Sequence, residues 1–172
     1  MGTNLLKTSL FALLFAVLTI AGNPAKAVDF IIEPLDYDVP AEVEAAAEDG
    51  KNLVIMFSLN GCPYCAKMHK RVFPHPDVMG QYNKTFVMFE VNIKGDLNVV
   101  THTGETKPEK DYAQDMRVRA TPVFVFYGKD GNDVLRLTGY QDPKMFMAAG
   151  RYVSSEAYKD GTSFLSFVRS GK

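Results

Sequence analysis

The two cysteines of the chain, Cys62 and Cys65, are separated only by Pro63 and Tyr64. A disulfide between cysteines this close encloses almost no chain, so it removes little entropy from the unfolded state and stabilises the fold poorly. Redox chemistry is a better use of the pair, because one thiolate can attack a disulfide and the other thiol can resolve the mixed disulfide. The spacing therefore predicts a redox-active dithiol, with Cys62 as the nucleophile and Cys65 as the resolving thiol.

Metal or haem binding is the alternative use of such a pair. A zinc site usually needs a second pair of ligands, and the chain has three histidines and no further cysteine. Covalently attached haem requires a histidine directly after the second cysteine, where this sequence has Ala66. His69 lies one helical turn after Cys65, so a Cys62/Cys65/His69 metal site is an alternative, although such a histidine is more often packed or solvated. We expect no metal and no cofactor.

The sequence around the cysteines predicts the elements that position them. Residues 52–59 are a continuous apolar run, which is typical of a strand buried on both faces. A turn ends this run, and a helix is expected to begin at Cys62, since Pro63 is tolerated in a first turn. Unsatisfied N–H groups at the helix start favour an anion, so the pKa of Cys62 should fall below the usual value of about 8.5. We expect Cys62 to be exposed and Cys65 to be more buried.

Helices and strands are predicted to alternate along the rest of the chain. Helices are expected at residues 40–48, from 62 to a break near 74–76, at 77–82, 108–116, 142–154 and 163–169; strands are expected at 52–59, 85–93, 122–127 and 133–138, with a small hairpin within 95–107. This order predicts an α/β domain with a mixed central β-sheet flanked by helices on both faces.

The N-terminus has the layout of a secretory signal peptide. Lys7 precedes an uncharged apolar run at residues 10–21, which is too short to span a bilayer, and a small-x-small pattern ends at Ala27. We expect cleavage after Ala27, export to the periplasm, and one mature domain of residues 28–172; an anchor that stays attached is the alternative. The net charge of −1 and the lack of a Lys/Arg cluster give no indication of nucleic-acid binding.

The sequence resembles the thioredoxin superfamily over nearly all of residues 28–172. The resemblance rests on the strings NLVIMFSLNGCPYC, TFVMFEVNI and ATPVFVF, on a following Lys-Asp-Gly turn, and on Gly139 with Tyr140. Within the superfamily, the strings CPYCAKMHKRVFPHPDV, VNIKGD and RLTGYQDPKMF resemble SoxW-type periplasmic thioredoxins. The resemblance implies a thioredoxin fold.

The same resemblance implies a substrate groove beside the cysteines. In thioredoxin-like proteins the proline before the third strand is cis and faces the C-x-x-C pair, a role that falls to Pro122 here. Thr121 would offer backbone groups to a substrate polypeptide, and Gly139 would lie beside them. Pro63 and Tyr64, at the helix start, would complete the groove, although Tyr64 could instead simply cover the thiols.

Two positions depart from the thioredoxin pattern. Thioredoxins have a tryptophan just before the first cysteine and a buried aspartate six residues before it, which helps the resolving thiol lose its proton. Here these positions hold Gly61 and Met56. Glu90, the charged residue of FVMFEVNI, lies on the neighbouring strand, so we expect it to be largely buried and to accept the proton of Cys65. A glutamate turned to solvent is the alternative.

Together these expectations describe an exported thiol:disulfide oxidoreductase that reduces protein disulfides through its CPYC dithiol. Its partners would be protein disulfide and thiol substrates and a membrane thiol-reducing electron-transfer protein that recharges the dithiol, and we expect a monomer. Disulfide oxidation or isomerisation is the alternative, because the Pro-Tyr dipeptide does not determine the reduction potential. A Cu(I) carrier is disfavoured, since carriers with this fold have three residues between their cysteines.

Overall fold

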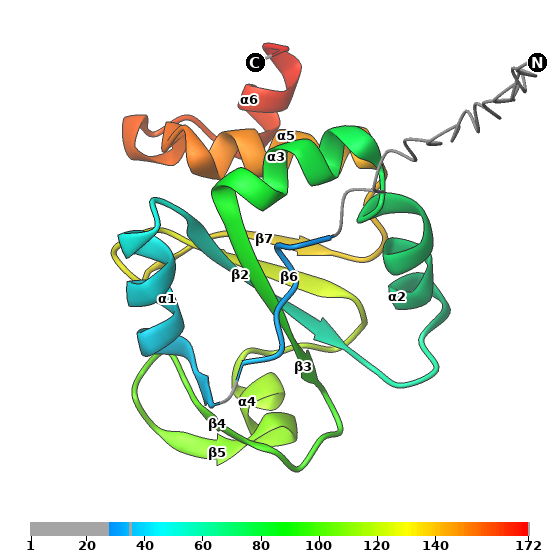
Figure 1. Ribbon diagram of the computed structural model, residues 1–172, viewed down its shortest axis with the longest axis vertical. Coiled ribbons are helices and arrows are strands. Elements are labelled where there is room, and N and C mark those ends of the chain that lie inside the picture. The colour runs from blue at the N-terminus through cyan, green and yellow to red at the C-terminus, as the bar shows by residue number, and fades with distance from the viewer. Residues whose placement is uncertain (1–27, 35, 172) are drawn as a thin grey trace, which may run out of the picture.

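The structure of the chain, a computed structural model, describes residues 28–34 and 36–171. The expected signal peptide, residues 1–27, lies outside the described residues. Helices and strands alternate along the described part (Figure 1). The helical segments are α1 (Val39–Glu48), α2 (Pro63–Lys67), the π-helical η1 (Met68–Val72), α3 (Pro76–Thr85), α4 (Glu109–Asp115), α5 (Pro143–Ser154), the short η2 (Ala157–Asp160) and α6 (Phe164–Arg169). None of these is long and apolar enough to cross a membrane.

A four-stranded mixed sheet forms the centre of the molecule, in the order β3-β2-β6-β7. Its strands are β2 (Asn52–Ser58), β3 (Phe86–Asn92), β6 (Val123–Tyr127) and β7 (Asp133–Thr138). β2 pairs in parallel with β3 and antiparallel with β6, and β6 pairs antiparallel with β7. The predicted mixed sheet and its closing hairpin are confirmed, with boundaries within one or two residues of those expected.

Two hydrophobic cores cover the two faces of this sheet. Successive residues of a strand point to opposite faces, so Val54 and Met56 pack into the core under α2, α3 and α5. The alternate residues of β2 pack into the core under α1 and α4: Leu53, Ile55 and Phe57. All five side chains are at most 1% exposed. The prediction of helices on both faces is therefore confirmed.

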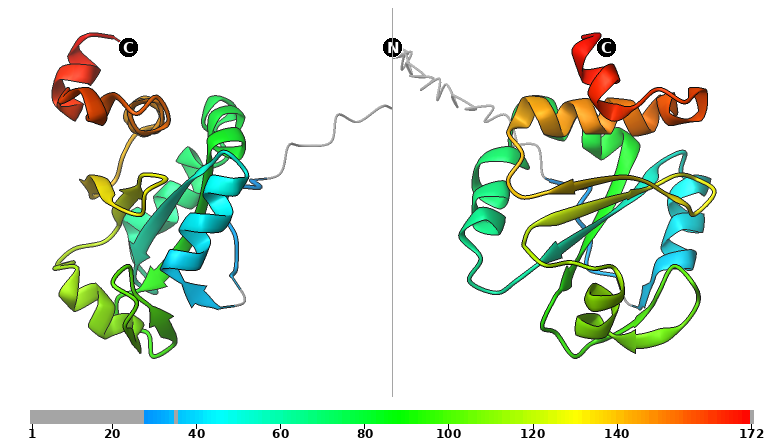
Figure 2. Two further views of the ribbon diagram at one scale, coloured as in Figure 1. Left: turned by 90° about the vertical axis from the view of Figure 1, so that its left-hand side faces the viewer. Right: turned by 180° about the vertical axis from the view of Figure 1, so that it is seen from behind.

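The ring of Phe146, on α5, contacts aromatic side chains from three other segments of the chain. Its ring stacks on Tyr82 of α3, with centroids 4.4 Å apart, and the Tyr82 hydroxyl donates to the Phe146 carbonyl over 2.7 Å. Phe73, directly after η1, and Phe124 of β6 also contact this ring, at 5.7 and 5.2 Å. Figure 2 shows α3 and α5 lying side by side. This aromatic cluster holds the segment that follows α2 against the sheet.

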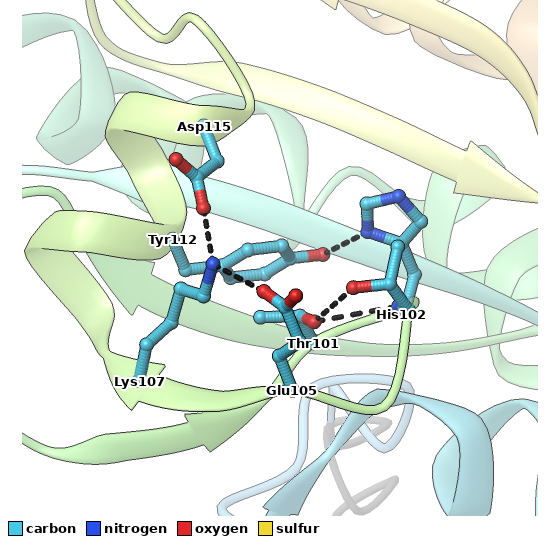
Figure 3. Close-up of polar contacts among 7 residues, drawn as sticks. Thr101, His102, Glu105, Lys107, Tyr112 and Asp115 are labelled. Carbon is cyan, nitrogen blue, oxygen red and sulfur yellow. Dashed lines mark hydrogen bonds and ion pairs between the residues drawn. The ribbon is translucent and has the colours of Figure 1, made fainter.

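A second, smaller sheet lies at the end of the molecule opposite α5 and α6 (Figure 2). Its strand order is β1-β4-β5. Its strands are β1 (Tyr37–Asp38), β4 (Asn98–Val100) and β5 (Thr106–Pro108), of which β4 and β5 form the predicted hairpin. Polar contacts tie this hairpin to α4: Lys107 pairs with Glu105 and Asp115, and the Tyr112 hydroxyl contacts His102 (Figure 3). The Tyr112 hydroxyl also contacts that of Tyr127 in the main sheet. His102 thus belongs to a structural network.

A buried carboxylate stabilises the end of β3. Glu109 is 4% exposed, and its Oε1 accepts a hydrogen bond from the Asn92 N–H over 2.7 Å. A Cβ at Gly95 would lie 1.8 Å from Glu109 Oε2, so only glycine fits where the loop closes over this carboxylate. The hydrogen bond from Asn92 to Glu109 fixes the backbone of β3 two residues beyond Glu90.

Candidate active site

Cys62 is the N-cap of α2, directly after β2. Gly61, with φ of +80°, turns the chain at the end of the strand, and the Cys62 N–H donates to the Leu59 carbonyl over 2.9 Å. The Cys62 sulfur then accepts the N–H of Cys65 over 3.1 Å. This hydrogen bond satisfies one of the backbone donors that a helix start leaves open. The predicted helix start at Cys62 is confirmed.

The loop before β6 reaches the same point from the other side. Because β6 runs antiparallel to β2, its first residues lie beside the last residues of β2, with Val123 in register with Phe57. The Thr121–Pro122 peptide bond, just before this strand, is cis, as expected. The Cys62 thiol donates to the Thr121 carbonyl over 3.6 Å. Sheet topology therefore brings the thiol and this loop into contact.

The two free thiols differ in acidity. Burial opposes ionisation of Cys62, but hydrogen bonds from the Cys65 thiol, from the Thr121 side chain and from backbone N–H groups outweigh it and hold the pKa of Cys62 below its ordinary value of 9.0. Burial, together with the hydrogen bond to Cys62, raises the pKa of Cys65 to about 11. Cys62 is therefore the thiol that ionises first.

The expected exposure of Cys62 is wrong. Its side chain is 8% exposed, close to the 5% of Cys65. The Thr121 carbonyl and the start of α2 enclose the sulfur. The low pKa of Cys62 therefore comes from hydrogen bonds and not from contact with solvent.

The expected groove residues lie around Cys62. Pro63 and Tyr64 are exposed at the start of α2, Tyr64 by 57%. The Gly139 N–H donates to the Pro122 carbonyl over 2.7 Å, and the φ of Gly139 is +84°. The backbone after β7 thereby lies against the cis-proline loop.

A cation–π contact that the sequence did not suggest involves Tyr140, the residue after Gly139. The Lys67 ammonium lies 3.9 Å from the centre of the Tyr140 ring. The contact connects α2 to the segment that follows β7, two elements far apart in the sequence. Pairs of this kind carry no local pattern, so only the fold reveals them.

Glu90 lies on the same face of the sheet as Met56, its register partner on β2. Its side chain is 29% exposed, so the expectation that it is largely buried is wrong. The reason is topological: β3 is an edge strand of the main sheet, and Glu90 lies near its end. His69 Nε2 is 2.6 Å from Glu90 Oε1, a pairing that the sequence analysis missed.

A shallow pocket of about 300 Å³ joins these groups. It is lined by Cys62, Cys65, His69 and Glu90 together with the end of β2 and the turn that follows. Among the described residues, no three His, Cys, Asp or Glu side chains are arranged to hold a metal ion together. The structure therefore gives no support to the alternative Cys62/Cys65/His69 metal site.

Fold and site together are those of a thioredoxin-fold protein. Residues 39–154 match the family model described as a thioredoxin-like domain, and the chain belongs to this family. No curated protein matches the sequence. The particular likeness to SoxW-type proteins stays a prediction.

Solved structures show the same fold. A thioredoxin-fold protein from Helicobacter pylori is 21% identical with a TM-score of 0.58, covering 83% of this chain and 84% of that chain. A thioredoxin from Thermus thermophilus is 28% identical with a TM-score of 0.55, covering 73% of this chain and 91% of that chain. The reduced C-terminal domain of DsbD from Neisseria meningitidis is 18% identical with a TM-score of 0.50, covering 67% of this chain and 93% of that chain.

Brief alkylation of the reduced protein at neutral pH should label Cys62 well before Cys65, because the thiolate is the reactive form. The labelling rate of Cys62 should rise with pH through a pKa below 9.0, whereas Cys65 should stay slow until the pH nears 11. Peptide mass spectrometry after a short pulse of a small alkylating reagent measures both rates. Equal labelling of the two thiols would contradict the assignment.

Proposed function

We propose that this protein is a thiol:disulfide oxidoreductase that acts on protein disulfides. The observation that carries the proposal is the position of the Cys62 sulfur, which accepts the Cys65 N–H and faces the Thr121 carbonyl beside the cis-proline. The Cys62 thiolate attacks a substrate disulfide, and one substrate sulfur leaves as a thiolate. Cys65 then attacks Cys62, forms the internal disulfide and releases the second substrate sulfur.

The groove around Cys62 supports a polypeptide substrate. Thr121 would offer backbone groups to an extended chain, as in strand addition to an open edge. Gly139 would support the loop that presents them, because its N–H is bonded to the Pro122 carbonyl. Pro63 and the exposed ring of Tyr64 would contact side chains of that substrate. Glu90 would supply the carboxylate that takes part in removing the proton of Cys65.

A Cys65→Ser variant should trap substrate proteins on Cys62 as stable mixed disulfides. The N-cap hydrogen bond uses the backbone N–H of residue 65, which serine keeps, so Cys62 stays reactive while the resolving step is lost. Non-reducing electrophoresis and mass spectrometry detect the adducts. The matched Cys62→Ser variant should trap none; trapping by that variant instead would reverse the two roles, and trapping by neither would contradict thiol exchange on proteins.

Reduction is the direction that we propose, with electrons supplied by a membrane thiol-reducing protein. The main causes of the lowered pKa of Cys62 are hydrogen bonds, and none of these comes from a positively charged side chain. Strong oxidants instead stabilise their reduced form. We therefore expect a midpoint potential nearer to roughly −270 mV, as in thioredoxin, than to roughly −120 mV. Equilibration with glutathione measures the midpoint potential, and a value near roughly −120 mV would favour disulfide oxidation.

Export to the periplasm is proposed from the sequence of residues 1–27 alone. If the apolar run is a cleaved signal peptide, intact-mass measurement of the protein from a periplasmic fraction should give Val28 as the first residue. A membrane-bound chain that keeps residues 1–27 would support the anchor instead.

A further inference from the structure

His69 is held in place at two points. Its Nε2–H donates to Glu90 Oε1 over 2.6 Å, and its ring meets Phe73 nearly at a right angle, with centroids 4.9 Å apart. Phe73 is itself 1% exposed within the aromatic cluster around Phe146. His69 also belongs to the π-helical segment η1, and π-helical turns occur frequently at functional sites. The imidazole is thus oriented rather than free to rotate.

The pocket that His69 and Glu90 line also contains both thiols. Its volume of about 300 Å³ leaves room for water molecules, each of which occupies about 30 Å³. The titratable side chains that line it are Cys62, Cys65, His69 and Glu90. Water in this shared pocket would give a proton that leaves Cys65 a path to the histidine–carboxylate pair.

We propose that His69 and Glu90 act as one proton-accepting pair for Cys65, with His69 as the positioning residue that sets when the pair can accept. This inference rests on the proposed thiol exchange and deepens it. Cys65 needs such help because burial raises its pKa to about 11, so the thiol seldom ionises at neutral pH by itself. Met56 occupies the position from which a thioredoxin aspartate would act.

The resolving step transfers one proton and exchanges one sulfur–sulfur bond for another. The Cys65 thiol loses its proton to the pair through water, and its sulfur forms a bond to the Cys62 sulfur. The bond between Cys62 and the substrate sulfur breaks, and its electron pair leaves with the substrate as a thiolate. Over the two steps the Cys62/Cys65 dithiol is oxidised by two electrons to the internal disulfide and the substrate disulfide is reduced by two, so no other oxidant is needed.

Charges around His69 determine the pH at which the pair accepts a proton. The hydrogen bond to Glu90 raises the pKa of His69 above its ordinary value of 6.5, against the opposing effect of burial. Lys70 and Arg71 flank it on its own segment, and Tyr37 of β1 lies within the electrostatic influence of Glu90. Below this pKa the imidazolium already holds the proton. Above it the neutral ring beside the carboxylate can accept one, so the resolving step should accelerate as the pH rises.

A two-phase experiment separates this inference from the proposed function. Reduced protein is mixed with one equivalent of an aromatic disulfide whose released thiolate is coloured, between about pH 5 and pH 9. The first thiolate released reports attack by Cys62, and the second reports attack by Cys65 on the mixed disulfide. If the unchanged protein shows no first phase, the proposed function itself fails.

His69→Gln and Glu90→Gln should affect the first phase much less than the second, because the main causes of the lowered pKa of Cys62 are hydrogen bonds with Cys65, Thr121 and backbone N–H groups. On the high-pH plateau both should slow the second phase about tenfold or more. The unchanged protein should show a rise of the second phase through a pKa above 6.5. Glu90→Gln should move this rise to lower pH, and His69→Gln should abolish it.

His75→Gln is the matched control. His75 has a similar exposure, 39% against 42% for His69, and its Nδ1 lies 3.9 Å from Asp77, but it does not line the pocket with the thiols. This variant should match the unchanged protein in both phases. An unchanged second phase in both test variants, or an equal slowing at every pH, would overturn the inference. If His69→Gln does not fold, as judged by circular dichroism, Glu90→Gln decides alone.

Discussion

Complete burial of β2 on both faces is the constraint on which the rest of the structure depends. From Asn52 to Phe57 no side chain is more than 4% exposed. A strand with no solvent-exposed face requires helices on both faces of the sheet and a neighbouring strand at each edge. The neighbouring strands of β2 are β3 and β6. The place where β2 ends is therefore a point where a parallel neighbour, an antiparallel neighbour and a helix start meet. The site lies there as a consequence of the packing.

The position of the Cys62 sulfur depends mainly on the backbone. The Cys65 N–H and the Thr121 carbonyl fix the Cys62 sulfur, and both belong to the main chain. The same helix start covers Cys65, whose pKa rises while that of Cys62 falls. Two identical side chains thus acquire different roles because one caps the helix and the other lies within its first turn. The residue types between them matter less for this division than the turn itself.

Local patterns predicted most of the fold and the central pair of the site. The apolar run at 52–59 and the turn after it are local features, so β2 and the helix start at Cys62 follow from the sequence. The exposure of Glu90 could not be read in this way, because it depends on β3 being an edge strand, which is a property of the whole sheet.

Contacts between distant segments were equally hidden from the sequence. The pairing of His69 with Glu90 and the burial of Glu109 each join segments that no sequence period connects. The sequence did place His69 one helical turn after Cys65, which suggested a metal site as an alternative. Its partner Glu90 lies on another element, so the sequence did not reveal their pairing. A local pattern can thus mark a residue as chemically placed without revealing what it acts with.

The exchange of a central aspartate for Met56 has a physical logic once Glu90 is considered with it. A carboxylate in the middle of β2 would face an apolar core, where desolvation of its charged form is costly. Met56 is fully buried there and completes the packing. Glu90, its register partner on the edge strand, is 29% exposed and has an imidazole partner, two conditions that lower the cost of holding a charge. An acid on β3 instead of β2 leaves the packing of β2 undisturbed. In the proton transfer that we propose, it also pairs the acid with a histidine, a residue whose charge changes near neutral pH, in the pocket that holds the thiols.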